Sequence, residues 1–188
     1  RIESDLEEMV NIKVDGKSDE DLWANAFGVE FDGYRIKTVV DQDNLYVLLN
    51  FLSTDPMRNP FENEGIFNGD ALEIAFSSNP DLQKKRKHYY TTDQHIGINL
   101  QHPNKVWDWQ SQTQLDNASV SSSINGALHQ FEIQIPLSSL NVNSFKKGRT
   151  YGIEFALDRS SHTDIRKEQS RWNSYDREGF HENPSLWG

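Results

Sequence analysis

The sequence contains no cysteine among its 188 residues, and this absence removes several classes of site at once. Disulfide bridges, thiolate nucleophiles and zinc sites built on thiolates all require this side chain. Long apolar runs are also missing, since none approaches the roughly 20 residues that a helix needs to cross a bilayer. We therefore expect no membrane insertion.

Basic side chains are scarce relative to acidic ones. The chain has 19 Lys and Arg residues against 29 Asp and Glu residues, which gives a formal net charge of -10. An acidic surface repels the phosphate backbone of nucleic acids and the headgroups of anionic membranes. We expect no nucleic-acid partner, whereas uncharged ligands and cations are compatible with this charge.

Aromatic residues are well represented, at 11 % of the chain, and they are spread along its whole length. Each of them supplies a large apolar area for burial. Disordered chains have few aromatic and β-branched residues, so this composition indicates a folded protein. A length of 188 residues fits one domain with one core, and we predict a single domain over residues 1–188.

Short stretches of alternating apolar and polar residues, typical of half-buried strands, recur along the chain. Residues 34–51 and 119–135 are predicted to be hairpins, and the second turns at Asn125-Gly126, a strong hairpin signal. A further hairpin is predicted over 88–100, joined at Asp93-Gln94. About ten strands and no long amphipathic helix predict an all-β fold, a two-sheet antiparallel β-sandwich or jelly roll with short helical turns.

Three of the predicted strands carry a glutamate on the face opposite their large apolar residues. The period of two places Glu73, Glu132 and Glu154 on this second face. One interpretation is a solvated sheet surface with cross-strand ion pairs, and another is a shallow polar bed for a ligand. The alternation alone does not separate the two.

The segment Val14-Asp-Gly-Lys-Ser-Asp-Glu-Asp-Leu-Trp23 joins an aspartate-glycine turn to a short helical turn. Gly16 permits the turn, and we expect Trp23 to be a large buried plug. Four further strand-and-turn segments follow, at residues 40–47, 69–74, 131–140 and 151–156. Taken in this order, and over almost the entire chain, these segments resemble the family 9 carbohydrate-binding modules.

The resemblance implies a β-sandwich that binds glycans without catalysing a reaction. Members are commonly appended to bacterial enzymes of polysaccharide breakdown, so we expect a carbohydrate ligand and a catalytic domain or enzyme as partner. We also expect an exported protein, whether secreted, periplasmic or on the cell surface, with its signal peptide ahead of Arg1. The resemblance often includes structural calcium, and the oxygen donors available to it are Asp41, Asp43, Asp55, Glu62, Glu64, Asp70 and Asp158.

A sugar site needs aromatic rings for the apolar C–H face of a pyranose and polar groups for its hydroxyls. Trp107 and Trp109 stand two residues apart in a polar stretch, and Trp172 also has polar neighbours. Packing in the core or against loops is the alternative for these three indoles, and we expect Trp187 to seal the core. The predicted carbohydrate-binding residues are Trp107, Trp109, Arg171, Trp172, Asn173 and Tyr175.

Three other functions compete with glycan binding. A glycosidase would need two carboxylates on either side of a glycosidic bond, and no pair is marked by the sequence, so no catalytic residue is predicted. A haem-binding electron carrier of related fold would need axial ligands, but Met9, Met57 and the six histidines form no recognisable haem motif, so we expect no haem. A protein-adhesion module of the same fold would bind a protein partner instead of a glycan.

Overall fold

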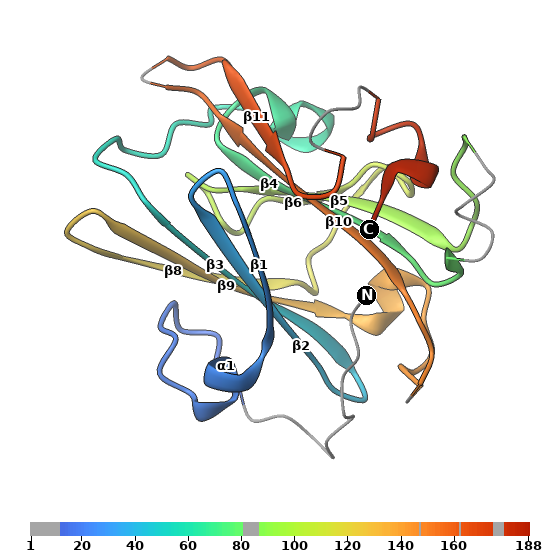
Figure 1. Ribbon diagram of the computed structural model, residues 1–188. Coiled ribbons are helices and arrows are strands. Elements are labelled where there is room, and N and C mark those ends of the chain that lie inside the picture. Colours follow the sequence, from blue (N-terminus) through green and yellow to red (C-terminus); the bar gives the residue numbers. More distant parts are fainter. Residues whose placement is uncertain (1–11, 81–86, 147, 162, 175–178) are drawn as a thin grey trace. The chain divides into compact units, whose positions relative to one another are not determined.

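The computed structural model describes residues 12–80, 87–146, 148–161, 163–174 and 179–188. These residues form eleven strands in two antiparallel sheets (Figure 1). The helices in the described residues are short, and none is long and apolar enough to cross a membrane. They are α1 (Asp21–Asn25) and the 3-10 helices η1 (Asn63–Asn68), η2 (Leu137–Leu140) and η3 (Pro184–Leu186). The predicted all-β class with two antiparallel sheets and short helical turns is confirmed.

The first sheet has five strands in the order β1-β2-β3-β9-β8. Their bounds are β1 Phe27–Phe31, β2 Tyr34–Val40, β3 Asn44–Leu52, β8 Ser119–Asn125 and β9 Leu128–Pro136. Both predicted hairpins of this sheet are confirmed, because β2 pairs with β3 and β8 pairs with β9. Gly126 makes the second turn possible, since it has a φ of 61°, which favours glycine.

Trp23 lies on one face of this sheet, where α1 delivers it. Its side chain is 2 % exposed and packs in a cluster with Ile12, Tyr46 and Leu48. The prediction that this tryptophan is a buried plug is therefore confirmed. Because burial of an indole leaves its N–H in need of an acceptor, a polar group must reach into the same cluster.

Glu132 of β9 is that acceptor. One carboxylate oxygen, Oε1, accepts the indole N–H of Trp23 at 2.9 Å. The other, Oε2, accepts the backbone N–H groups of Asp15, Gly16 and Lys17 at 3.0, 2.9 and 3.2 Å. The side chain is fully buried, so the interpretation of a solvated sheet face is wrong at this position. Glu132 instead fixes the segment before α1 against the sheet.

The second sheet has six strands in the order β11-β10-β4-β5-β6-β7. Their bounds are β4 Ala71–Ser77, β5 Asp93–Asn99, β6 Val106–Asp108, β7 Thr113–Gln114, β10 Gly152–Arg159 and β11 Glu168–Arg171. The hairpin predicted over 88–100 is wrong, because Asp93 and Gln94 lie inside β5 and pair with β4. The turn closes earlier, where the Asp93 backbone N–H donates to the Tyr90 carbonyl at 3.0 Å and the Asp93 carboxylate accepts the Tyr90 N–H at 2.8 Å.

The central strands β4 and β10 are buried on both faces. On one face, the small side chains of Ala75 and Ala156 leave room for Phe180 and Trp187, and these four residues form a cluster. The indole N–H of Trp187 donates to the Phe180 carbonyl at 3.0 Å. Trp187 is 5 % exposed, which confirms that the end of the chain packs into a core.

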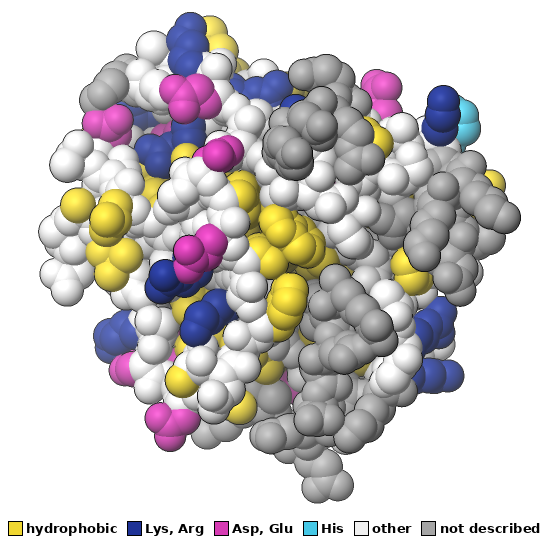
Figure 2. Space-filling view, viewed as in Figure 1, with side chains coloured by type: hydrophobic (Ala, Val, Ile, Leu, Met, Phe, Trp, Pro, Cys, Tyr) yellow, Lys and Arg dark blue, Asp and Glu magenta, His cyan; other side chains and the backbone are white. Residues whose placement is uncertain are grey.

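The chain divides into two compact units, each built around one sheet. One unit comprises Asp55–Asp116 and Thr150–Gly188 and contains the six-stranded sheet. The other comprises Ile2–Thr54 and Asn117–Arg149 and contains the five-stranded sheet. On the face of the molecule shown in Figure 2, acidic and basic side chains are interspersed among the described residues, so that face presents no extended surface of one charge.

Replacing Glu132 with alanine is expected to destabilise the protein by about 2–4 kcal/mol, because three backbone N–H groups and one indole N–H lose their acceptor. Urea unfolding followed by circular dichroism measures the change. Glu30→Ala, in the exposed edge strand β1, is the matched control and should stay within about 0.5 kcal/mol of the unmodified protein. A loss below about 1 kcal/mol in Glu132→Ala would contradict the anchoring role.

Candidate carbohydrate-binding site

The face of the six-stranded sheet that carries Glu73 gathers polar side chains from four neighbouring strands. We call it the Glu73 face. Strand register places Glu73 of β4 opposite Gly97 of β5 and Ala156 of β10, and places Asp158 of β10 opposite Gln169 of β11. Since side chains alternate along a strand, these residues share one face, while the large apolar residues of the same strands lie on the other.

A cavity of about 340 Å³ opens on the Glu73 face. Its size falls in the range of about 300–1,000 Å³ that is usual for small-molecule sites. The cavity combines aromatic rings with groups that can donate or accept hydrogen bonds. It is lined by Phe67, Glu73, His95, Trp109, Arg166, Gln169, Arg171, Gly179 and His181.

Glu73 is the polar centre of the cavity. Its Oε1 accepts a hydrogen bond from Nε2 of Gln169 at 2.9 Å, and its Oε2 lies 2.6 Å from Nε2 of His95. Burial lowers the pKa of His95 to about 4, so the imidazole is neutral at physiological pH and donates its Nε2–H to the carboxylate. Each carboxylate oxygen therefore keeps a lone pair for one further donor.

Asp158 lies beneath this centre, with its side chain fully buried. Its Oδ1 accepts hydrogen bonds from Nη1 of Arg166 and from Nε2 of Gln169, both at 2.9 Å. The same Arg166 nitrogen lies 3.9 Å from Oε1 of Glu73. Burial raises the pKa values of both carboxyl groups, and the effect is greater for Asp158.

Trp109 forms an aromatic wall of the cavity. Its ring lies against Gly97, where a Cβ atom would come within 2.3 Å of the indole. The indole N–H donates to the Glu64 carbonyl at 3.0 Å, and the ring lies 4.5 Å from the imidazole of His95 between centroids. The absence of a side chain at Gly97 thus allows the indole to lie close to the sheet.

Phe67 forms a second aromatic wall, from the long loop that precedes β4. Its ring centroid lies 6.3 Å from that of Trp109, with the two planes at 58°, and the guanidinium of Arg166 lies 5.2 Å from the phenyl centroid. The backbone N–H of Arg166 also donates to the carbonyl of Asn68. Two loops distant in sequence therefore place their side chains together at the cavity.

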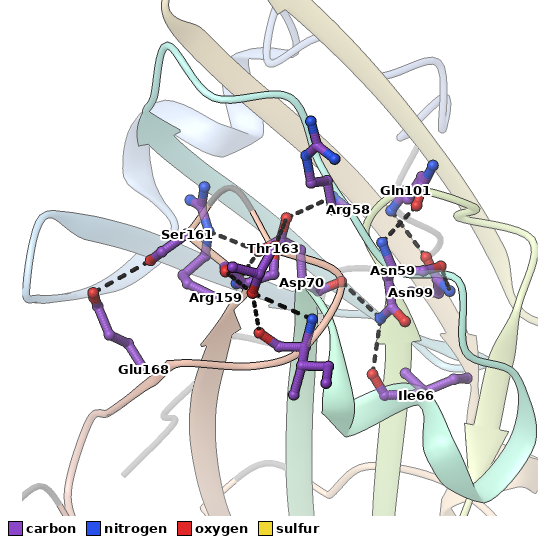
Figure 3. Close-up of polar contacts among 12 residues, drawn as sticks. Arg58, Asn59, Ile66, Asp70, Asn99, Gln101, Arg159, Ser161, Thr163 and Glu168 are labelled. Atoms are coloured by element: carbon purple, nitrogen blue, oxygen red, sulfur yellow. Dashed lines mark hydrogen bonds and ion pairs between the residues drawn. The ribbon is translucent and has the colours of Figure 1, made fainter.

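Buried Asp70 joins these two loops (Figure 3). Its Oδ2 accepts the Arg58 backbone N–H at 2.6 Å, and its Oδ1 accepts the Ser160 backbone N–H at 2.7 Å and Nε of Arg159 at 3.1 Å. Asn59, also fully buried, closes the first loop on itself by donating from Nδ2 to the carbonyls of Ile66 and Asp70 at 2.8 and 3.0 Å. This network fixes the loop that carries Phe67.

Of the residues predicted from the sequence to bind carbohydrate, Trp109 and Arg171 line the cavity. Trp107 stands opposite Gly97 in β6 and is half-buried, but it is not among the lining residues. Tyr175 lies outside the described residues.

Trp172 and Asn173 follow β11 and are held by structural contacts. The Trp172 ring lies 6.1 Å from that of Phe155, on the opposite face of the sheet from Glu73, and it covers the terminal Gly188. The Asn173 side chain donates to the Leu186 carbonyl at 2.7 Å. Neither residue lines the cavity.

Glu154 holds this same segment. Its Oε1 accepts the backbone N–H of Asn173 at 2.9 Å, and its Oε2 accepts that of Ser174 at 3.0 Å. The side chain is fully buried, and burial raises its pKa. Glu154, like Glu132, is a backbone anchor, so neither the solvated interpretation nor the polar-bed interpretation holds for it.

Apart from Glu73, which the polar-bed interpretation included, the cavity has six lining residues that the sequence analysis did not assign to a sugar site: Phe67, His95, Arg166, Gln169, Gly179 and His181. Two of them carried a usable signal. His95 alternates with Ile96 and Ile98, which places it with Gly97 on the second face of the strand. Phe67 belongs to a long loop, and long loops in compact domains are often functional. Arg166 and His181 come from irregular segments and join the cavity only through tertiary contacts.

Two of the carboxylates considered as calcium donors, Asp41 and Asp70, accept hydrogen bonds within the protein. Oδ1 of Asp41 accepts the backbone N–H groups of Asp43 and Asn44 at 2.8 and 2.7 Å, and Asp70 joins the two loops described above. No group of three or more His, Asp or Glu side chains is arranged to hold a metal ion within the described ranges. The carboxylates described are therefore not gathered around one point, and a structural calcium ion stays a prediction.

Comparison with known proteins places the chain among carbohydrate-binding domains. The family described as "Carbohydrate family 9 binding domain-like" matches residues 14–188. The chain matches none of the curated proteins with which it was compared.

Two solved structures share the fold, both of a family 9 carbohydrate-binding module from Caldicellulosiruptor kristjanssonii. The complex with glucose is 20 % identical, with a TM-score of 0.73, over 96 % of this chain and 91 % of that one. The complex with cellotriose is 19 % identical, with a TM-score of 0.73, over 96 % and 89 %. At this identity the likeness establishes the fold, and it agrees with the predicted fold class.

Replacing Gly97 with alanine is expected to displace the indole of Trp109, because the added Cβ would lie 2.3 Å from the ring. The clash should cost about 1–3 kcal/mol of stability and break the indole hydrogen bond to Glu64. The chemical shift of the Trp109 indole N–H in a ¹H–¹⁵N spectrum reports this change. Gly28→Ala is the control, since the nearest atom to its Cβ would belong to the flexible Lys37 side chain at 3.3 Å, and the Ile36 carbonyl oxygen follows at an ordinary 3.5 Å. An unchanged indole resonance in Gly97→Ala would contradict the packing argument.

Proposed function

The chain belongs to the carbohydrate family 9 binding domain-like proteins, and from this premise we propose that the cavity on the Glu73 face is its sugar-binding site. Family membership establishes that the domain binds carbohydrate. We propose where on the domain the sugar binds and which residues contact it.

One observation carries the assignment: two aromatic rings and a set of fixed polar groups surround the same cavity. Trp109 and Phe67 offer apolar surface to the C–H face of a pyranose. Glu73 and the amide oxygen of Gln169 can accept from sugar hydroxyls, whereas Arg171 can donate to them. Because the polar groups are already held by hydrogen bonds to one another, little side-chain ordering remains to be paid on binding.

We infer that the ligand is glucose or a short β-glucan. The solved structures of similar fold contain glucose and cellotriose, and the cavity of about 340 Å³ is at the small end of ligand sites. The acidic chain, with a net charge of -10, is better suited to an uncharged saccharide than to an anionic one.

We further propose that the domain binds without cleaving. A glycosidase needs two carboxyl groups on either side of the scissile bond, about 5–9.5 Å apart. Here the carboxyl groups of Glu73 and Asp158 accept hydrogen bonds from one nitrogen of Gln169, and Asp158 is fully buried beneath the cavity. This arrangement favours binding over hydrolysis.

We also propose that the protein is secreted or bound to the cell surface, and that it works with an enzyme of glycan breakdown. This proposal is supported by the family to which the chain belongs, whose ligands are carbohydrates.

A glycan array followed by calorimetry tests the proposal. We expect binding to glucose or to β-glucan oligosaccharides, and Trp109→Ala should weaken it at least tenfold, which corresponds to about 1.4 kcal/mol, because the variant removes the larger aromatic wall. Phe67→Ala should weaken it in the same direction.

Phe27→Ala is the matched control, because Phe27 is an exposed aromatic residue on β1 of the other sheet. This variant should bind the sugar with unchanged affinity. Trp107→Ala and Trp172→Ala should bind within about threefold of the unmodified protein, since neither side chain lines the cavity. If Trp109→Ala bound sugar with full affinity while Trp172→Ala lost sugar binding, the assignment would be wrong, and the site would lie in the segment after β11.

A further inference from the structure

We propose that Asp158 is a positioning residue of the sugar site: it holds Gln169 and Arg166 in place and carries a proton that leaves Glu73 as the accepting carboxylate. This inference rests on the proposed function. Asp158 does not line the cavity, so it acts through the residues above it.

The contacts of Asp158 tie it to two residues that do line the cavity. Its Oδ1 accepts hydrogen bonds from Nη1 of Arg166 and Nε2 of Gln169, both at 2.9 Å. Its Oδ2 is buried and accepts no hydrogen bond from the described residues. Oδ2 is therefore the oxygen on which a proton can reside without breaking a contact to Arg166 or Gln169.

Gln169 links Asp158 to Glu73. Its side-chain amide nitrogen donates to Oδ1 of Asp158 and to Oε1 of Glu73, both at 2.9 Å. A primary amide has two N–H groups, so each carboxyl group takes one of them. Two buried carboxyl groups therefore share the amide nitrogen of Gln169 as a hydrogen-bond donor.

The geometry of the pair favours one proton. Arg166 and Arg171 supply positive charge to the cluster, and His95 is neutral because burial lowers its pKa to about 4. If both acids were ionised, Oδ2 of Asp158 would be a buried carboxylate oxygen without a donor among the described residues, beside a second buried carboxylate, which is costly. Burial raises the pKa values of both acids, and the charge of Glu73 raises that of Asp158 further. The proton accordingly resides on Asp158, and the two groups titrate as a pair.

Other titratable and charged groups face the pair from the elements packed around it. Burial raises the pKa of Glu73 and the Arg171 charge opposes that rise, while burial and then the Glu73 charge raise the pKa of Tyr89. His181 has its pKa lowered by burial, so it is neutral near pH 7. Among the described residues these groups are His95 and Asp93 from β5, Asp108 from β6, Arg171 from β11, and Tyr89, Arg166, His181 and Glu182 from loops.

When Asp158 loses its proton at alkaline pH, the charge beneath the sugar site changes. Asp158 then bears a negative charge beside Glu73, and the two carboxylates repel each other in a buried setting. Because the folded-state pKa of Asp158 lies above its unfolded value, the stabilising effect of its proton is present at low pH and is lost as the pH rises through the folded pKa. Sugar affinity should fall over the same range, since the repulsion displaces Glu73, the carboxylate that accepts from the sugar.

Calorimetric titration with cellotriose from pH 5 to pH 9 tests the inference. The unmodified protein should bind with constant affinity at the acidic end and lose at least fivefold toward the alkaline end. Asp158→Asn mimics the protonated acid, so it should keep its affinity within about threefold at pH 6 and lose the alkaline decline. Asp158→Ala should bind at least tenfold more weakly at every pH. Asp41→Asn, which alters a buried aspartate in the β2–β3 turn, is the matched control and should keep the profile of the unmodified protein.

Carboxyl ¹³C shifts measured over the same pH range give a readout independent of sugar. One carboxyl of the pair should titrate well above the ordinary aspartate range, and Asp158→Asn should remove that titration. An Asp158→Asn variant with the alkaline decline intact, or carboxyl shifts that both titrate near pH 4, would overturn the role of Asp158 while leaving the sugar site in place. Failure of the unmodified protein to bind any glycan at any pH would instead overturn the proposed function, and the inference with it.

Discussion

The candidate site depends on the burial of Glu73, because a carboxylate placed under a cavity must find donors within the protein. His95, Gln169 and Arg166 supply contacts to it, and each of them also lines the cavity. The same contacts that make burial of the charge tolerable therefore fix the polar groups that a ligand would meet. Asp158 completes the arrangement from below, where it holds Arg166 and Gln169.

Three glutamates illustrate how one sequence pattern leads to different uses. Glu132 and Glu154 are fully buried and accept mainly backbone N–H groups, so each of them anchors a chain segment against a sheet. Glu73 accepts hydrogen bonds from side chains, and it remains adjacent to an open cavity. The chemical class of the donor, backbone or side chain, separates the structural carboxylates from the one at the site.

The sequence predicted those parts of the fold that depend on local patterns. The alternation of residues in β9 and β10, and the Asn125-Gly126 turn, were sufficient to assign strands, faces and one hairpin. The hairpin over 88–100 was wrong because the Tyr90–Asp93 turn draws its hydrogen bonds from a side chain as well as from the backbone, which residue types alone do not reveal.

The site was harder to predict than the fold, because its residues meet only through sheet register and loop packing. Trp109 could be singled out from its polar neighbours, but its place beside Gly97 depends on the pairing of β5 with β6. Arg166 reaches the cavity because Asp70 joins two loops that are far apart in the sequence. Neither relation leaves a signal in a single sequence.

The central claim is that a saccharide occupies the cavity on the Glu73 face. Titration of ¹⁵N-labelled protein with cellotriose, followed by side-chain N–H resonances, tests it most directly. The account predicts that the indole N–H of Trp109 and the side-chain amide of Gln169 shift together and saturate at one dissociation constant. Shifts confined to the five-stranded sheet, or to the segment around Trp172, would contradict it.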